Sequence, residues 1–92
     1  MTDKTPEIAT VWNRIWTHAG EDFTMVLGEQ FTYAVAHNTV TPSRTNQQIA
    51  KSDFEKALAR VPFKNTTDVQ DLRGPSFVYA ILMDERIRAG EW

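Results

Sequence analysis

His18 and His37 are the first side chains to consider for catalysis, because histidine changes its charge close to neutral pH. His18 lies at the end of a predicted helix, where the helix dipole stabilises a positive charge. It could join Glu21 or Asp22 around a metal ion, but a metal site needs three or four ligands and no others lie nearby in the sequence. His37 lies in a predicted hairpin turn. We interpret both as solvated side chains and expect no metal site.

Nucleophilic and cofactor chemistry has equally little support. The chain has no cysteine, which removes thiolate nucleophiles and zinc–thiolate sites. Ser76 follows Gly74 and Pro75 instead of occupying the Gly-x-Ser-x-Gly elbow of hydrolases. The four glycines form no phosphate-binding or dinucleotide-binding pattern. We expect no cofactor. An enzyme acting on a small polar substrate is the third interpretation, with these loosely grouped candidates: Tyr33, His37, Arg44 and Asp71.

The segment from residue 42 to residue 64 is the most suggestive of function. It is basic, with five Lys or Arg against two Asp or Glu, in a chain of net charge −2. Its first part is rich in side chains that can bind anions or the edges of nucleic-acid bases. The candidate ligand-binding residues are Arg44, Thr45, Asn46, Gln48 and Lys51. The segment favours a non-catalytic binding module with an anion or nucleic-acid contact surface around residues 43–51, against the alternative of a solvated polar face.

Tryptophans supply a different hypothesis. Trp12 and Trp16 are four residues apart, so they share one face of a helix. Large aromatic side chains at this spacing usually pack in the core. The alternative is an exposed aromatic patch, to which Trp92 could add, that serves a protein–protein or homodimer interface.

Apolar spacing predicts a first helix over residues 6–19. Thr5 is a good N-cap, Pro6 suits the first helical position, and Gly20 suits the end of the helix. Alternating residues then predict strands over 23–27, 31–36 and 39–41, with Pro42 at the end. These strands form a three-stranded antiparallel meander.

Two helices are predicted in the C-terminal half. Ser52 and Glu55 match a capping box, and the helix that follows ends at Pro62. Residues 77–83 are apolar on every side, so periodicity leaves helix and strand open there. The preceding Pro75 and the charged residues that follow favour helix. The expected fold is therefore α+β, with an N-terminal helix, the meander, and two C-terminal helices packed on one sheet face.

The length of 92 residues fits a single globular domain over 1–92, with residues 1–5 and 89–92 frayed. The polar N-terminus lacks the basic and apolar regions of a signal peptide, and the longest apolar run is too short to span a bilayer. We expect a cytoplasmic protein without a membrane partner.

Three segments of the sequence, Ser43–Asn46, Lys51–Leu58 and Gly74–Leu82, together with Phe31-Thr32-Tyr33, resemble a group of short uncharacterised bacterial proteins. Those proteins carry Ser-Arg-Thr, Ser-Asp-Phe-Glu-Lys-Ala and Gly-Pro-Ser-aromatic segments. No activity is attached to the group. The resemblance implies that Arg44, Ser52 and the turn at residues 74–76 belong to one spatial unit.

Overall fold

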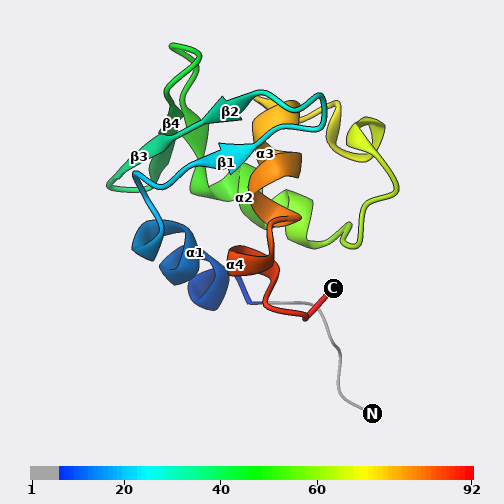
Figure 1. The fold of residues 1–92 in the computed structure, drawn as a ribbon. Coiled ribbons are helices and arrows are strands. Elements are labelled where there is room, and N and C mark those ends of the chain that lie inside the picture. Colours follow the sequence, from blue (N-terminus) through cyan, green and yellow to red (C-terminus); the bar gives the residue numbers. More distant parts are fainter. Residues whose placement is uncertain (1–6) are drawn as a thin grey trace.

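The computed structural model describes residues 7–92, and these form an α+β fold, as the sequence predicts (Figure 1). The elements in chain order are α1 (Ile8–Thr17), β1 (Phe23–Thr24), β2 (Gln30–Phe31), β3 (Tyr33–Ala36), β4 (Thr39–Pro42), β5 (Ile49–Ala50), α2 (Lys51–Leu58), the 3₁₀ helix η1 (Thr66–Val69), α3 (Pro75–Leu82) and α4 (Glu85–Arg88). No helix within these residues is both long enough and apolar enough to cross a bilayer.

The antiparallel sheet has three strands in the order β3–β4–β5. Its membership differs from the meander expected over 23–41, because β1 pairs with β2 in a separate two-stranded sheet. The third strand of the main sheet is instead Ile49–Ala50, which pairs with β4. A strand of two residues is too short to show an alternating pattern, so no periodicity predicts it.

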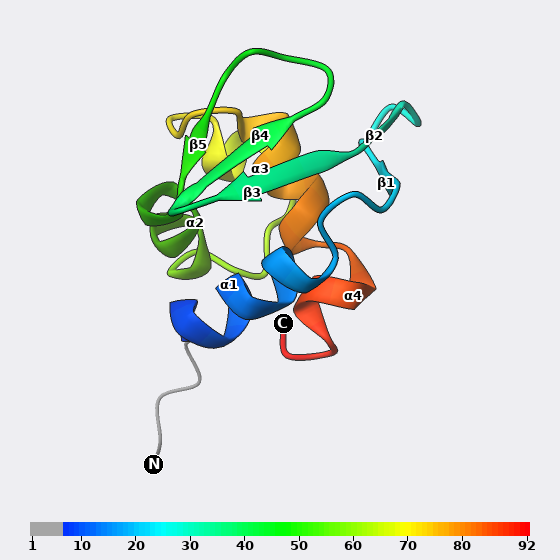
Figure 2. The same cartoon turned by 90° about the vertical axis from the view of Figure 1, so that its left-hand side faces the viewer.

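Helices cover one face of this sheet, as expected. In Figure 2 the three strands lie in front, while α2 and α3 lie behind them. The outward face carries small side chains, and Ala34 and Ala36 of β3 are exposed on it. α1 lies below the sheet, next to α4 (Figure 2).

The core between sheet and helices is aromatic and aliphatic. Trp12 packs against Phe54 of α2, with ring centroids 5.8 Å apart, and Phe23 packs against Tyr33 at 5.1 Å. Tilted pairs of this kind add to the stability gained from burial. The prediction that the first helix and the strands bury their aromatic residues is therefore confirmed for these side chains.

Helix α1 begins later than the sequence predicts. Its first helical residue is Ile8, and Glu7 is the extended N-cap residue, whereas Thr5 and Pro6 lie outside the described residues. Gly20 follows the helix with φ +89°, a left-handed conformation that only glycine adopts without strain. The helix itself ends at Thr17, with His18 as its C-cap residue, so it stops two residues before the predicted end at residue 19.

Helix α2 begins at Lys51, so the predicted cap at Ser52 is wrong. Ala50 is the N-cap residue, and its N–H donates to the Asp53 carboxylate at 3.2 Å. The cause is tertiary: the Lys51 N–H donates to the Asn38 carbonyl at 2.8 Å, so pairing with β4 keeps the chain extended up to Ala50. Ser52 is the second helical residue, and its hydroxyl is not used as a cap.

The apolar segment over 77–83 is helical up to Leu82, as Pro75 indicates; it belongs to α3, and Met83 is the C-cap residue. Gly74, before this helix, has φ +60°, and a Cβ there would lie 2.7 Å from Ile49 Cδ1. Glycine therefore lets α3 pack closely on β5. The expected charged continuation is a separate helix, α4, because Asp84 accepts a hydrogen bond from the Arg86 N–H at 2.9 Å and begins a new helical turn.

Side chains of the C-terminal residues 89–92, for which the sequence predicts fraying, contact the rest of the fold. The Glu91 carboxylate accepts two hydrogen bonds from the Arg14 guanidinium of α1, at 3.0 and 2.8 Å. The Trp92 indole N–H donates to the Leu82 carbonyl at 2.8 Å. Residues 1–5, also expected to fray, lie outside the described part of the chain.

Candidate functional site

The contact surface expected over residues 43–51 is divided by the sheet. Arg44 follows the last residue of β4 by two positions, whereas Lys51 lies beside Asn38, just before β4 begins. The four residues of β4 separate these ends by about 13 Å. The two basic residues therefore lie at opposite ends of the strand and do not form one cluster.

Arg44 is already engaged within the chain. Its guanidinium lies 3.7 Å from the Glu29 carboxylate and donates to the Gln30 carbonyl at 3.4 Å. In the same loop, the Thr45 hydroxyl accepts a hydrogen bond from the Gln47 N–H at 3.1 Å. Asn46 and Gln48 are exposed beside them. An anion at this end of the sheet would compete with the carboxylate of Glu29.

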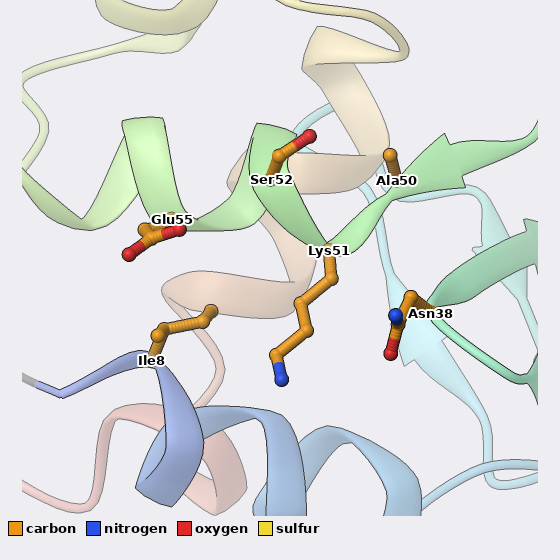
Figure 3. Close-up of a pocket in the computed structure, with 6 residues that line it drawn as sticks. All are labelled: Ile8, Asn38, Ala50, Lys51, Ser52 and Glu55. Carbon is orange, nitrogen blue, oxygen red and sulfur yellow. The ribbon is translucent and has the colours of Figure 1, made fainter.

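Lys51, at the other end, lines a hollow of about 360 Å³ that also involves Ile8, Asn38, Ala50, Ser52 and Glu55. This volume falls in the range of small-ligand pockets. In Figure 3 the side chains of Lys51 and Asn38 point to the same side, toward α1, whereas the Ser52 hydroxyl points away from them.

The charge in this hollow is set by Lys51. Its ammonium lies 6.0 Å from the centre of the Trp12 ring, a distance at which an aromatic face attracts a cation weakly. It forms no ion pair with any of residues 7–92. The nearby Asp53 carboxylate accepts a hydrogen bond from the Ala50 N–H. Among the residues that line the hollow, the carboxylate is that of Glu55. The arrangement can accept one anionic group between Lys51 and the Asn38 amide.

The three tryptophans do not form a common exposed patch. Trp12 is 7% exposed and belongs to the core, so its place in a surface interface is wrong, while Trp16 is 48% exposed. Trp92 is partly buried and packs on the core. Of the three tryptophans proposed for an exposed aromatic interface, Trp16 is the one that remains a candidate.

Residues proposed for an enzyme are not brought together either. The Tyr33 hydroxyl is buried and donates to the Ile15 carbonyl at 2.7 Å, and burial raises its pKa above the usual value. His37 is an exposed residue of the β3–β4 turn with φ +57°. Asp71 is paired with Arg60, whose hydrogen bonds lower the pKa of that carboxyl. Among residues 7–92, no group of three His, Asp or Glu side chains converges as metal ligands would.

A charged network that the sequence did not suggest joins α4 to the segment between α1 and β1. The Arg86 guanidinium donates to the Asp84 carboxylate at 2.8 and 2.9 Å, to Glu21 at 3.0 Å and to the Asp22 carbonyl at 2.7 Å. It also lies 3.9 Å from the centre of the Phe23 ring. Partners 65 positions apart along the chain leave no local pattern, so this network, which we call the Arg86 clamp, could not be found from the sequence.

Hydrogen bonds in the Arg86 clamp determine the charge states of its carboxyl groups. Arg86 lowers the pKa of Asp84. The pKa of Glu21 is lowered by His18, which lies 3.0 Å away, and then by Arg86. Both carboxyl groups are thus hydrogen-bonded to a neighbour within the chain, which is typical of a structural ion network and not of a site that binds a further ligand.

A second surface feature was also missed. Val26 and Leu27, at the turn between β1 and β2, are 61% and 92% exposed. Together with Met25, Glu29 and Ser76 they line a small hollow of about 50 Å³. The alternating pattern predicts that both residues belong to a strand over 23–27, in which one of them would be buried. The strand β1 instead ends at Thr24.

The turn at residues 74–76 lies close to the region of Arg44 but does not line the hollow that Ser52 lines. A Cβ at Gly74 would approach Ile49 of β5, and Ser76 meets the turn that contains Glu29, the partner of Arg44. Ser52 instead lines the hollow at the start of α2. No protein-family model, curated protein or solved structure matches the chain.

Proposed function

We propose that the protein is a non-catalytic binding module that takes one anionic group, a phosphate or a carboxylate, in the hollow beside Lys51. The observation that supports this function is the Lys51 ammonium: it points to the side of the hollow shared with Asn38 (Figure 3) and has no ion-pair partner among residues 7–92. A charge-assisted hydrogen bond to such a cation is about twice as strong as a neutral one.

The charges around the hollow favour a ligand with a single anionic group over a polyanion. Glu55 lines the same hollow, and Arg44 lies at the far end of β4 beside Glu29. A nucleic acid bound along its backbone needs several cations in a row. A nucleic-acid ligand would therefore bind here through one phosphate. The cysteine-free composition agrees with the cytoplasmic location that we assign to this module.

The proposal is tested by an NMR titration of ¹⁵N-labelled protein at low salt with three probes: inorganic phosphate, AMP and a single-stranded DNA of eight nucleotides. We expect AMP to shift the amide signals of Asn38 and of residues 50–53. Lys51→Gln should weaken this binding about tenfold or more, because it removes a hydrogen bond to a charged group. For the DNA, a single phosphate contact predicts that the logarithm of the binding constant falls with the logarithm of the salt concentration with a slope of about −0.7. A steeper slope would indicate contacts with several phosphates.

Lys56→Gln is the matched control. Lys56 is an exposed lysine on the same helix and does not line the hollow, so this variant should bind like the unaltered protein. The absence of any shift at Asn38 and residues 50–53 with all three probes contradicts the proposal. An equal loss of binding in the two variants also contradicts it, since that result would show a diffuse charge effect.

A second candidate function is self-association, which is supported by Trp16. Its ring is 48% exposed, and tryptophan is among the side chains that contribute most to protein interfaces. Sedimentation equilibrium should then give a mass that rises above 10.5 kDa with concentration. A constant mass of one chain contradicts this candidate and leaves the Lys51 proposal unaffected.

A further inference from the structure

Strand β3 is an edge of the three-stranded sheet. The strand order is β3–β4–β5, so β3 has β4 on one side and no strand on the other. In Figure 2 it is the lowest strand of the sheet, above α1. An edge strand exposes a row of backbone N–H and C=O groups that can pair with another chain.

The register shows which residues of β3 direct these groups toward β4. The Ser43 N–H donates to the Thr32 carbonyl at 2.8 Å, and Ala34 is paired with Thr41. Hydrogen-bonded pairs alternate with non-bonded pairs along an antiparallel ladder. Residues 32, 34 and 36 therefore bond to the neighbouring strand.

The intervening residues, Tyr33 and Val35, direct their backbone groups outward. The Tyr33 carbonyl confirms this geometry, because it accepts a hydrogen bond from the Gly20 N–H, outside the sheet, at 2.9 Å. The N–H and C=O of Val35 have no such partner among residues 7–92. Polar backbone groups of this kind are satisfied by water or by another chain.

The segment at Gly20 covers this edge beside Tyr33, but no residue of β3 protects the part beside Val35. Soluble proteins usually place lysine, proline or a bulge on an exposed edge strand to prevent pairing. Residues 31–36 contain neither charge nor proline. The exposed side chains beside Val35 are Ala34 and Ala36, which are small enough to let another strand approach.

We propose that β3 pairs antiparallel with β3 of a second copy of this chain, across a twofold axis that passes beside Val35. This inference rests on the second candidate function and supplies its surface. In the pair, the N–H and C=O of each Val35 bond to those of its partner, which is the self-complementarity that a twofold interface requires. The uncharged strand lets two chains of net charge −2 meet without local repulsion.

Trp16 supports the same position for the interface. It directly follows Ile15, whose carbonyl accepts a hydrogen bond from the Tyr33 hydroxyl, and its ring is exposed on the same turn of α1. A pair of four-residue strands is smaller than the interface of about 800 Å² per partner found in stable complexes. We therefore expect a dimer that forms only at high concentration, between about 0.1 and 1 mM.

The experiment compares sedimentation equilibrium and amide hydrogen exchange over concentrations from about 10 µM to about 1 mM. The mass should rise from 10.5 kDa toward twice that value. Exchange of the Val35 amide should slow by about threefold or more over the same range, because its N–H becomes bonded. Val35→Pro removes this donor, and Ala36→Lys places equal charges across the twofold axis; both should remain monomeric.

Ala59→Lys is the matched control, since Ala59 is an exposed residue at the end of α2. It should associate like the unaltered chain. Ala36→Lys retains the backbone donors of β3, so it decides the question even if Val35→Pro fails to fold. If the Ala36→Lys variant still forms a dimer and the exchange of the Val35 amide does not depend on concentration, the protein self-associates through a surface other than β3. A monomer throughout overturns both.

Discussion

Arg14 bonds α1 to the Ile87 carbonyl and to Glu91, and Arg86 bonds α4 to the segment before β1. By contrast, the Lys51 ammonium has no ion-pair partner, and the backbone N–H and C=O of Val35 have no hydrogen-bond partner, among residues 7–92. Among the buried side-chain nitrogen and oxygen atoms of the described residues, only Arg88 Nε has no hydrogen-bond partner. On the sheet side, a cation and an edge strand are left open. Groups satisfied internally stabilise the fold, and groups left open are the ones that a ligand or second chain can use.

The largest effect in this comparison is expected for Arg86→Ala. It removes hydrogen bonds to Asp84, Glu21 and the Asp22 carbonyl and the contact with the ring of Phe23. Hydrogen bonds to charged groups contribute about 1.5–3 kcal/mol each and are not additive, so we expect the free energy of unfolding to fall by about 2–4 kcal/mol. Urea unfolding followed by tryptophan fluorescence measures this change.

Arg73→Ala is the control for the Arg86 variant. Arg73 is exposed and forms no ion pair with the described residues, so its loss should change the stability by less than about 0.5 kcal/mol. If the two variants are equally stable, the clamp does not hold the helical side together.

A smaller effect is expected from acid. The pKa of Asp84 is lowered in the folded state by Arg86, from an ordinary value of 3.8. The stability contributed by this group is therefore present above the ordinary pKa and is lost as the pH falls through the lowered one. The free energy of unfolding should decrease as the pH is reduced from about 5 to about 3, by less than in Arg86→Ala at neutral pH.

Urea midpoints measured at several pH values test this dependence. The Arg86→Ala variant should show a shallower decrease than the unaltered protein, because Asp84 then has a similar pKa in the folded and unfolded states. Parallel curves for the two proteins would show that Arg86 does not control the titration of Asp84.

The smallest effects on stability are expected on the sheet side. Lys51→Gln and Ala36→Lys alter exposed or partly exposed side chains without an ion-pair or side-chain hydrogen-bond partner among residues 7–92. Each should change the free energy of unfolding by less than about 0.5 kcal/mol. The same urea experiment measures this change. A decrease in the free energy of unfolding above about 1 kcal/mol would show that the affected residue stabilises the fold.

The sequence alone determined the features that depend on local spacing. The apolar period located α1 to within two residues of its end at Thr17, and Pro75 distinguished a helical α3 from a strand. Alternation located the residues of β3 and β4. These signals come from backbone geometry and from one buried face, both of which act within a few residues along the chain.

The meeting places of the polar groups depend on contacts between distant parts of the chain. Pairing of β5 with β4 moved the start of α2 to Lys51 and separated it from Arg44. The partner of Arg86 in the segment before β1 is 65 residues away, and the sheet order alone made β3 an edge. Contacts between distant segments depend on how the elements pack, and packing leaves no periodic pattern in the sequence that could have revealed these neighbours beforehand.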